Sequence, residues 1–217
     1  MRTGIIGGAF NPVHCAHLSI AAALLRNCGL DRVIFVPTAN PPHKDVAQLA
    51  AFAHRFAMVE LAVAGFDGFE VSDIEMQREE RSYSVHTLQD FHRQYPDDSF
   101  YFLLGRDSLL SLHSWYNYTD IFELCHLVVA DRPVVGAEAA NTAVPVAIRQ
   151  HFCYDSTLKT LCHGSGNQLI FLPEPGEEVS ATDIRNKLVQ KQDVSGLVPS
   201  VVLEYIALHR LYADYER

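Results

Sequence analysis

The alternation of short apolar runs with longer amphipathic segments constrains the fold of this chain more than any other sequence feature. Such short runs are typical of strands that are buried on both faces of a sheet. The segments between them carry apolar residues three and four positions apart, which is typical of helices. Strands are predicted at residues 4–6, 32–36, 69–71, 100–104, 126–130 and 169–172, and helices at residues 17–27, 48–64, 84–95, 180–189 and 199–211.

Strands that alternate with helices predict βαβ units and therefore a parallel sheet. We expect one Rossmann-like, doubly wound α/β domain over residues 1–217, with a mainly parallel sheet and helices on both faces, because no linker, charge run or repeat divides the chain. Residues 133–168 are the least regular part, and a helix with loops is expected there. Ligands of such folds bind at the carboxyl ends of the strands, so the residues that follow each strand are the candidates.

Composition excludes several classes of function. The 217 residues include 17 Lys and Arg against 26 Asp and Glu, and the net charge of −9 argues against nonspecific binding of nucleic acid or of anionic membranes. No apolar run approaches the ~20 residues of a membrane span, and the first residues lack a signal-peptide layout. The five cysteines include no CxxC pair and fit reduced thiols. We therefore expect a cytoplasmic protein.

The segment GGAFNPVHCAH at residues 7–17 follows the first predicted strand. Its two glycines allow a tight turn and close approach of a ligand, and the helix that follows favours an anion at its N-terminus. His14 and His17 are three residues apart, so they can share a face at the helix start and donate to phosphate oxygens. The alternative is a glycine turn with two partly exposed histidines. Zinc is less favoured, because neither an HExxH frame nor a third ligand is evident.

Polar residues also follow two other predicted strands. Asp107, just past Gly105, is placed to accept from ribose hydroxyls or, alternatively, to cap a helix. Ser180 and Asp183 match a capping box, and Thr182 and Arg185 lie one turn apart at the same helix start. Two hydroxyls, a guanidinium and a helix N-terminus together predict a triphosphate cradle.

Two further segments are weaker candidates. Pro41 and Pro42 stiffen a loop that ends in the donors His43 and Lys44, although an exposed loop is the common alternative. Trp115 is the only tryptophan, and its polar flanks leave stacking on a ligand ring open beside a core position.

Three common nucleotide and hydrolase motifs are missing from the sequence. The glycines after the first strand do not fit GxGxxG, no Gly-Lys pair forms a P-loop, and no GxSxG nucleophile elbow occurs. No activated nucleophile stands out, so direct transfer between bound phosphates is favoured over covalent catalysis.

Residues 7–17 resemble the GG(T/S)F(D/N)PxHxGH signature of the nucleotidyltransferase superfamily, and residues 179–185 resemble its ISSTxxR signature. Residues 41–44, 82–88, 105–107 with Trp115, and the tail 197–212 are similar to bacterial nicotinate-nucleotide adenylyltransferases. The match runs in order over nearly the whole chain. Ala16 replaces the usual Gly, and Ala9 and Ala181 each lack a usual hydroxyl donor, which bears on phosphate binding and not on the reaction class.

The resemblance implies that ATP and nicotinate mononucleotide react to give deamido-NAD and pyrophosphate, in NAD biosynthesis. The acceptor phosphate would attack the α-phosphorus in line, so catalysis would be mainly positioning and charge stabilisation. Two alternatives stay open. One is another small-acceptor nucleotidyltransferase, such as a pantetheine-phosphate adenylyltransferase, and the other is a nucleotide-binding regulatory module without turnover.

The resemblance also implies the roles of individual residues. His17, His14 and Arg185 would be catalytic. Mg²⁺ would be held mainly by substrate phosphates, with no protein metal site, and the oligomeric state is open, with a homo-oligomer among the options. ATP would be bound by Gly7, Gly8, Ala9, Phe10, His14, His17, Gly105, Asp107, Ser180, Thr182 and Arg185, and nicotinate mononucleotide by His43, Lys44, Thr87, Trp115 and Tyr118.

Overall fold

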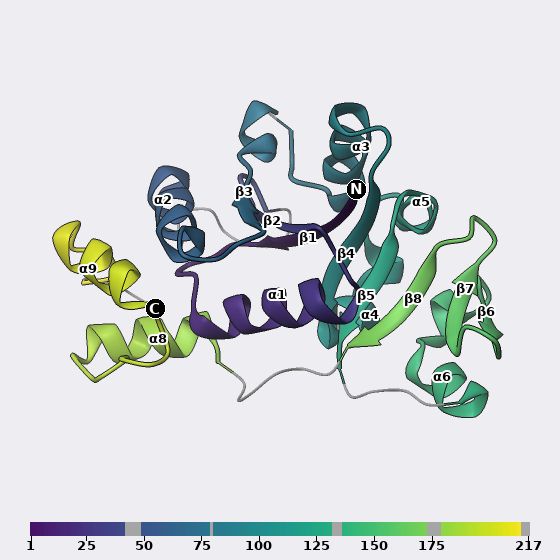
Figure 1. Cartoon of the computed structure of the whole chain (residues 1–217). Helices are drawn as coiled ribbons and strands as arrows, with labels where there is room; N and C mark the ends of the chain where they lie inside the picture. Colours follow the sequence, from purple (N-terminus) through teal and green to yellow (C-terminus); the bar gives the residue numbers. More distant parts are fainter. Residues whose placement is uncertain (42–48, 79, 132–135, 173–178, 214–217) are drawn as a thin grey trace. The chain divides into compact units, whose positions relative to one another are not determined.

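A computed structural model of the chain describes residues 1–41, 49–78, 80–131, 136–172 and 179–213 (Figure 1). The strands of the described residues form one sheet, hydrogen-bonded in the order β3-β2-β1-β4-β5-β8-β7-β6. The strands are β1 (Arg2–Gly8), β2 (Arg32–Pro37), β3 (Phe69–Val71), β4 (Ser99–Gly105), β5 (His126–Ala130), β6 (Phe152–Asp155), β7 (Thr160–His163) and β8 (Gln168–Leu172).

Helices connect most of these strands. The α-helices are α1 (Cys15–Asn27), α2 (Phe52–Val63), α3 (Ser84–Gln94), α4 (Arg106–Ser111), α5 (Tyr118–Leu124), α6 (Ala137–Ala143), α7 (Val146–Arg149), α8 (Ala181–Val189) and α9 (Ser200–Leu208), and the short 3-10 helices are η2 (Ile74–Gln77) and η3 (Leu112–Ser114). None of the helices within the described residues has the length and apolar character to cross a membrane.

The chain divides into two compact units. Unit 1 comprises Met1–Ile6, Ala23–Val33 and Tyr83–Glu174, and unit 2 comprises Gly7–Ala22, Ile34–Ser82 and Pro175–Arg217. The prediction that residues 1–217 form a single domain stays a prediction.

Unit 1 contains the parallel core of the sheet. Ile5 of β1 lies opposite Phe102 of β4, and β4, β5 and β8 continue in parallel register. The chain passes from β1 to β2 and β3 in one direction and from β4 to β5 in the other, so the reversal of strand order falls at the β1–β4 pair. This reversal defines a doubly wound sheet and confirms the predicted fold class.

Helices cover both faces of the sheet in unit 1. A Cβ atom on Gly4 would meet Leu24 of α1 at 3.0 Å, so the glycine lets this helix pack closely against β1. Phe100, which lies opposite the preceding residue of β1, makes a ring contact with Phe91 of α3 at 5.9 Å. Because successive strand residues face opposite sides, α1 and α3 cover opposite faces.

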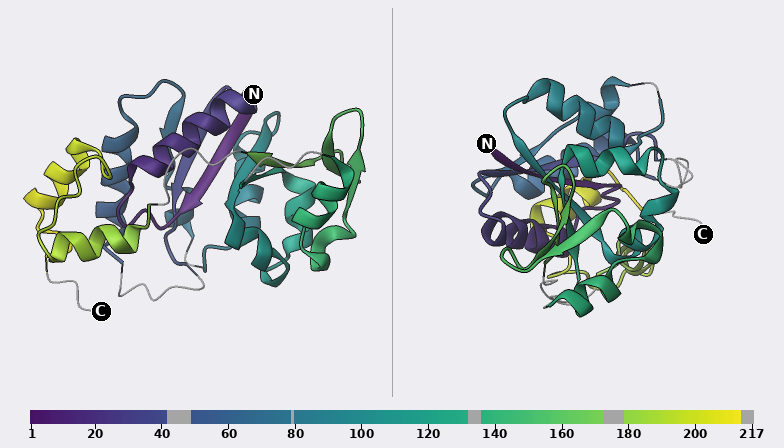
Figure 2. Two further views of the ribbon diagram at one scale, coloured as in Figure 1. Left: turned by 90° about the horizontal axis from the view of Figure 1, so that it is seen from below. Right: turned by 90° about the vertical axis from the view of Figure 1, so that its right-hand side faces the viewer.

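Two antiparallel strands extend the sheet of unit 1 beyond β8 (Figure 2). They lie within residues 133–168, where the sequence predicted only a helix and loops, and where α6 and α7 also lie. The strands β6 and β7 contain four residues each and α7 contains four, so none shows enough periods of an apolar pattern to be recognised. The remaining predicted strands and helices are confirmed within a few residues, except that residue 48, where the helix before β3 was expected to begin, lies outside the described residues.

Unit 2 is built around aromatic and aliphatic side chains from both of its halves. Phe35 of β2 contacts Phe10 at 5.8 Å and Phe69 of β3 at 5.6 Å between ring centroids. Met58 of α2 and Val202 of α9 are fully buried in the same unit, and α2 packs against both β3 and α9. This core supports the segment 7–14, which includes the last two residues of β1.

The Asp98 carboxylate joins three donors at the start of β4 in unit 1. Oδ2 accepts from Thr3 Oγ1 at 2.7 Å and from Arg32 Nη2 at 3.1 Å, and Oδ1 accepts from the Met1 ammonium at 2.9 Å. Burial raises the pKa of this carboxyl, but the hydrogen bonds outweigh burial and hold the pKa below its usual value. A carboxylate with a lowered pKa stabilises the fold above its unfolded pKa and loses that effect as the pH falls through its folded pKa.

We therefore predict that Asp98→Asn lowers the free energy of unfolding at pH 7 by about 1–3 kcal/mol. The difference from wild type should shrink as the pH falls below the usual pKa of an aspartic acid, because the unfolded chain then binds the proton before the folded chain does and the stabilising effect of the carboxylate is lost. Urea denaturation at pH 7 and at low pH measures both values. A difference that is the same at both pH values would contradict the assigned contacts.

Candidate active site

The segment of residues 7–14 in unit 2 turns back tightly over its own aromatic residue. Phe10 is 2% exposed and adopts a positive φ of 45°, a strained conformation for a residue with a side chain. A Cβ atom on Gly8 would approach the Phe10 ring at 3.2 Å, and the Gly8 carbonyl accepts from the backbone N–H of Thr38 at 2.8 Å. Gly8 therefore lets the backbone lie directly against the ring, but the tight turn expected at the two glycines is wrong, because Gly7 and Gly8 are the last residues of β1.

A buried arginine binds the backbone of this segment. Arg55 of α2 is 1% exposed, and it donates through Nη1 to the Ala9 carbonyl at 2.8 Å and through Nε to the Ala50 carbonyl at 2.9 Å. Burial lowers the pKa of its guanidinium, and Tyr212 and Glu75 oppose that shift. Arg55 could not be recognised from the sequence, since one arginine in a helix carries no motif.

Asn11 connects this segment to three other parts of unit 2. Its side-chain Oδ1 accepts from the backbone N–H of Ala50 at 3.1 Å and from the Tyr212 hydroxyl at 2.8 Å. Its backbone carbonyl accepts from Arg185 Nη1 at 2.7 Å. Asn11 is 2% exposed, so these hydrogen bonds are shielded from water. In the sequence, Asn11 and Tyr212 appear only as positions within segments that resemble the family, and nothing there indicates that they are in contact.

His14 and His17 lie together, as their spacing predicts. Their rings stack with centroids 3.6 Å apart, and the backbone N–H of His14 donates to His17 Nδ1 at 3.2 Å. A neutral His17 ring that accepts at Nδ1 carries its proton on Nε2, which makes Nε2 a hydrogen-bond donor. Phe10 packs edge-on against the His17 ring at 5.0 Å and fixes its orientation.

His14 is held neutral by its surroundings. The residue is 5% exposed, and burial lowers its pKa to about 4. Its Nδ1 is buried and has no hydrogen-bond partner among the described residues. A buried polar atom of this kind is costly unless another group, such as a ligand, satisfies it.

The start of α8 carries the second predicted group of donors in unit 2. Ser180 precedes the helix, and its hydroxyl accepts from the backbone N–H of Thr182 at 3.2 Å, which confirms the helix cap. Arg185 Nη2 donates to Thr182 Oγ1 at 3.2 Å while Nη1 reaches Asn11. The two sequence signatures therefore meet where Arg185 binds Asn11, a residue 174 positions away along the chain.

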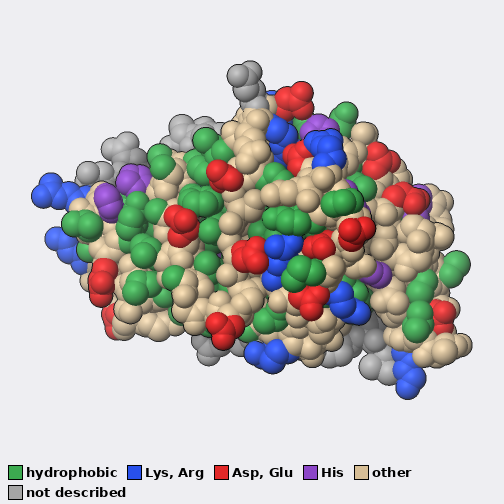
Figure 3. All heavy atoms as spheres, turned by 45° about the horizontal axis from the view of Figure 1, so that its top comes forward, with side chains coloured by type: hydrophobic (Ala, Val, Ile, Leu, Met, Phe, Trp, Pro, Cys, Tyr) green, Lys and Arg blue, Asp and Glu red, His purple; other side chains and the backbone are tan. Residues whose placement is uncertain are grey.

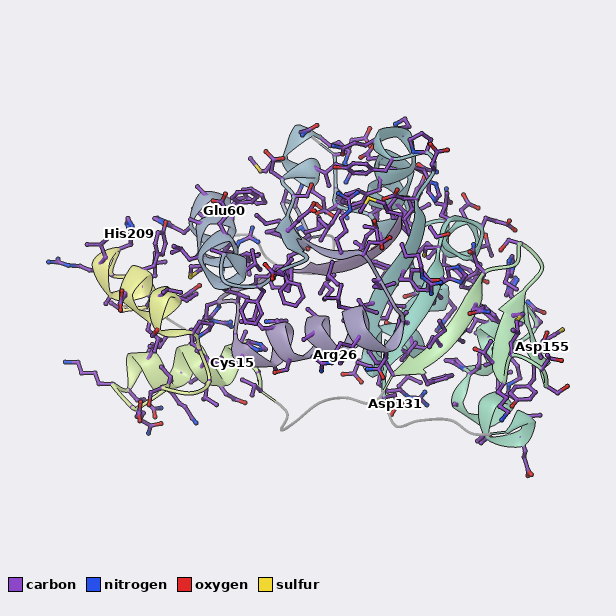
Figure 4. The ribbon with its side chains drawn as sticks, in the orientation of Figure 1. Cys15, Arg26, Glu60, Asp131, Asp155 and His209 are labelled. Atoms are coloured by element: carbon purple, nitrogen blue, oxygen red, sulfur yellow. The ribbon has the colours of Figure 1, made fainter. Side chains whose placement is uncertain are left out.

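Helix α1 begins beside this region, as the backbone contacts of its first residue show. The N–H of Cys15, which Figure 4 labels at the start of α1, donates to the Leu197 carbonyl between α8 and α9 at 2.8 Å. The helices α1 and α8 are long enough for their N-termini to carry a useful partial positive charge. The histidines, Arg185 and these helix starts make unit 2 suited to an anion with several oxygens.

Gly105 and Asp107 lie in unit 1, where β4 runs into α4. Gly105 is the residue before the helix, and Asp107 lies in its first turn and is exposed. The helix-cap interpretation of Asp107 is therefore wrong, since Gly105 takes that position. Arg106 between them pairs with Asp131 at 3.2 Å, donates to the Ala143 carbonyl at 2.7 Å, and lines an open cavity of about 710 Å³ beside α6.

The residues expected to bind the acceptor also lie in unit 1, where the structure describes them. Thr87 is buried in α3, Trp115 is half-buried at the end of η3, and Tyr118 begins α5. The Tyr118 N–H donates to the Trp115 carbonyl at 3.3 Å. Tyr83 stacks on Tyr116 at 4.7 Å, so the segment around Trp115 packs against the start of α3. His43 and Lys44 lie outside the described residues.

The surface does not gather charge of one sign on the face that Figure 3 shows, where acidic and basic side chains are interspersed. Among the described residues, no three His, Cys, Asp or Glu side chains are grouped in a way that could hold a metal ion.

The fold and the two joined signatures define the class of the protein. The family model described as cytidylyltransferase-like matches residues 5–187. A protein of Syntrophotalea carbinolica named "Probable nicotinate-nucleotide adenylyltransferase" is 45% identical over the full length of both chains. A protein of Geobacter sulfurreducens with the same name is 46% identical, over 98% of this chain and 99% of its own.

The solved structure titled Plasmodium falciparum nicotinic acid mononucleotide adenylyltransferase complexed with NaAD shares the fold. Its TM-score is 0.72, it is 19% identical, and the match covers 98% of this chain and 97% of that chain. The chain belongs to the nicotinate-nucleotide adenylyltransferases, enzymes of the nucleotidyltransferase class in the cytidylyltransferase-like family.

The hydroxyl of Tyr212 offers a direct test of the connection at Asn11. We predict that Tyr212→Phe, which removes that hydroxyl, lowers the free energy of unfolding by about 0.5–1.5 kcal/mol and speeds amide hydrogen exchange in residues 7–14. Tyr205→Phe is the matched control, because its hydroxyl contacts His54 Nδ1 at 3.0 Å and not this segment. Faster exchange of the segment in both variants, or in neither, would contradict the assignment.

The low pKa of His14 predicts a dependence of stability on pH. Its pKa is about 4 in the fold, below the usual value of 6.5. The unfolded chain therefore binds the proton first, and stability falls as the pH drops from 6.5 towards 4. Replacing His14 with Gln should remove most of this loss, on the order of 3 kcal/mol for a shift of this size. Urea denaturation of both proteins between pH 4 and pH 7.5 measures it, and parallel curves would refute it.

Proposed function

We propose that unit 2 holds the triphosphate of ATP between the segment of residues 7–17 and the start of α8, and that the chain transfers the adenylyl group of ATP to nicotinate mononucleotide. The hydrogen bond from Arg185 to the Asn11 carbonyl carries this proposal, because it brings both signatures into one donor-rich place. The names of the full-length relatives support the acceptor.

In this reaction, a 5′-phosphate oxygen of the acceptor attacks the α-phosphorus of ATP. The bond between that phosphorus and the β-phosphate bridging oxygen breaks, and pyrophosphate leaves with the electron pair. The attacking phosphate is already anionic, so no general base is needed. The buried neutral His14, whose pKa is about 4, fits a hydrogen-bonding role better than the transfer of protons at neutral pH.

His17 is proposed to stabilise the charge that develops as pyrophosphate leaves. Its neutral ring accepts at Nδ1 and therefore donates at Nε2, and stacking on His14 with the edge of Phe10 fixes the ring plane. A donor held in place before the reaction pays no reorganisation cost when the charge forms. His14 would contribute its buried, unpartnered Nδ1 side to the same environment.

Arg185, Ser180 and Thr182 are proposed to hold the β- and γ-phosphates. The Arg185 guanidinium is fixed at Asn11 and Thr182 by Nη1 and Nη2, so its plane is set before ATP arrives. Gly7, Gly8, Ala9 and Phe10 would let the backbone approach the nucleotide. The hydroxyl donors that Ala9 and Ala181 lack leave more of the phosphate binding to Arg185 and the helix starts.

The residues of unit 1 are proposed to bind the two nucleosides. Gly105 and Asp107 would contact the adenosine, and the exposed Asp107 carboxylate can accept from ribose hydroxyls. Trp115 would stack on the pyridine ring, with Thr87 and the backbone near Tyr118 at its carboxylate. His43 and Lys44 would face phosphates. A solved relative of the same fold is titled as a complex with NaAD.

Mg²⁺ is proposed as a companion of the substrate phosphates. His14, His17 and Arg185 supply donors, which suit phosphate oxygens and not a hard cation. When bound, the ion neutralises triphosphate charge and supports the departure of pyrophosphate. The chain's own residues are then left to orient the phosphates. We also propose that the protein works in the cytoplasm, in line with its reduced cysteines.

Two other functions remain as outcomes of experiment. A different small acceptor would leave the triphosphate site of unit 2 unchanged, and a regulatory module would bind ATP without turnover. The fixed Arg185 guanidinium and the fixed His17 ring favour turnover, because a protein that only binds ATP needs no donor placed to stabilise a developing charge.

Pyrophosphate release tests the acceptor. We predict release with ATP, Mg²⁺ and nicotinate mononucleotide, and a kcat/KM at least tenfold lower with the nicotinamide form. Donors aimed at a carboxylate form charge-assisted hydrogen bonds that a neutral amide cannot match. Phosphopantetheine is the control for the alternative acceptor. Equal use of the acid and amide forms would contradict the assigned pyridine site, and binding of ATP without release would indicate the regulatory module.

Removal of the His17 imidazole tests its role in the chemical step. We predict that His17→Ala lowers kcat on the order of 10²–10³-fold while ATP still binds, because one preorganised donor to a developing charge is lost. His209→Ala, which changes an exposed histidine of the same unit, is the matched control and should keep its kcat. Thermal melting establishes that both variants fold. A folded His17→Ala enzyme within about threefold of the wild-type kcat would remove His17 from the mechanism.

A further inference from the structure

Two cysteines lie directly opposite one another in the antiparallel hairpin of β6 and β7 in unit 1. Cys153 of β6 pairs with Cys162 of β7 in the strand register. Directly opposed residues of antiparallel strands have Cα atoms about 4.5–5.5 Å apart. Disulfides span about 4.4–6.8 Å between Cα atoms, so the Cα spacing of an opposed pair lies within the range of a disulfide.

The neighbouring pair shows that side chains meet across this hairpin. Phe152 and His163, the next opposed residues, make a ring contact at 5.8 Å, and both rings pack on Phe122 of α5, at 5.0 Å and 5.6 Å. Successive residues of a strand face opposite sides. Cys153 and Cys162 therefore share the other face of the hairpin, away from α5.

The hairpin is held in register at its turn and along β7. Asp155, which Figure 4 labels at this end of the sheet, accepts at Oδ1 from the backbone N–H groups of Thr157 and Leu158 at 2.7 Å and 2.9 Å. Thr160 Oγ1 donates to the Leu169 carbonyl of β8 at 3.1 Å. The two thiols are thus held opposite each other before any reaction.

The two thiols differ in their exposure. Cys153 is exposed on β6, which lies at the end of the strand order, and Cys162 is half-buried. Burial raises the pKa of the Cys162 thiol, and Asp155 and Cys153 raise it further. All five cysteines lie in described residues, and Cys28 and Cys125 are buried, with pKa values raised by burial. Cys153 is therefore the thiol that a reagent in solution reaches first.

We propose that Cys153 and Cys162 form a reversible modification site, in which a hydroperoxide oxidises the pair to a disulfide across the hairpin. The Cys153 thiolate attacks one oxygen of the peroxide, the O–O bond breaks, and the product is a sulfenic acid with water or alcohol released. Cys162 sulfur then attacks the Cys153 sulfur, the S–O bond breaks, and hydroxide leaves as water with the Cys162 proton. The two sulfurs lose two electrons, and the peroxide gains them.

The disulfide would join β6 covalently to β7 at the end of the sheet in unit 1. It would close residues 154–161 into a covalent loop, and separation of β6 from β7 would then require reduction. Whether such a disulfide persists depends on the reduction potential of its surroundings. Peroxide would therefore form the bond, and a thiol reductant would break it again. The proposal does not rest on the adenylyl transfer reaction.

Peptide mapping after oxidation tests this site. The native full-length protein is treated with hydrogen peroxide, alkylated, and digested with trypsin without reduction. Cleavage after Lys159 separates the peptide 150–159, which holds Cys153, from the peptide 160–185, which holds Cys162. We expect these two peptides to be joined in most molecules, with a mass lower by two hydrogen atoms than their sum, and to separate on reduction.

Three controls distinguish the site from general thiol oxidation. Cys153→Ser and Cys162→Ser should each abolish the joined peptides, and Cys28→Ser should leave them intact. Oxidation in urea should give mixed linkages among the cysteines, because the hairpin no longer selects the pair. In the oxidised native protein, amide exchange within residues 152–163 should slow at least tenfold. Absence of the joined peptides in the native protein, with Cys153 found as a sulfinic acid or in a dimer between two chains, would overturn the proposal.

Discussion

Asn11 is the residue on which the proposed site depends. It is almost fully buried, and its two oxygens bind the backbone before α2, the hydroxyl of Tyr212 near the end of the chain, and the guanidinium of Arg185. Each of these partners comes from a different stretch of sequence within unit 2. A buried amide must satisfy its polar atoms, so these segments can fold together only in the arrangement that supplies all three donors. The segment 7–14 is therefore held at Asn11 by hydrogen bonds from three other stretches of unit 2.

Arg55 holds the backbone of the same segment at a second point. Arg55 satisfies the Ala9 carbonyl, which points into the interior and would otherwise lack a partner at a tight turn. It also places a permanent positive charge next to the backbone at Ala9. His14 stays neutral at this place because burial lowers its pKa to about 4, so the positive charge comes from groups that do not titrate near neutrality.

Much of the fold and of the site could be predicted from the sequence. The apolar runs predicted the parallel strands, because strands buried on both faces need nearly continuous apolar residues. The glycines, the histidine spacing and the Ser180–Arg185 segment predicted a donor-rich place, and the structure brings those segments together. The hairpin of β6 and β7 could not be predicted, since its residues include Cys, Asp and His and show no apolar alternation. Nor could Arg55 and Tyr212 be predicted, because their partners are backbone and side-chain oxygens far away in sequence. The interpretation of Asp107 as a helix cap was wrong, because the residue before α4 is Gly105, which has no side-chain acceptor that the sequence could reveal.

Amide hydrogen exchange with and without ATP and Mg²⁺ tests most directly whether the two signatures form one site for phosphate. Exchange reports each segment separately and needs neither an acceptor nor turnover. The account predicts that ATP slows exchange in residues 7–17 and, at the same ATP concentration, in residues 180–185. In Arg185→Ala both effects should weaken together, because the guanidinium joins the segments at Asn11. Protection of only one segment, or protection of both that is unchanged in Arg185→Ala, would contradict the account.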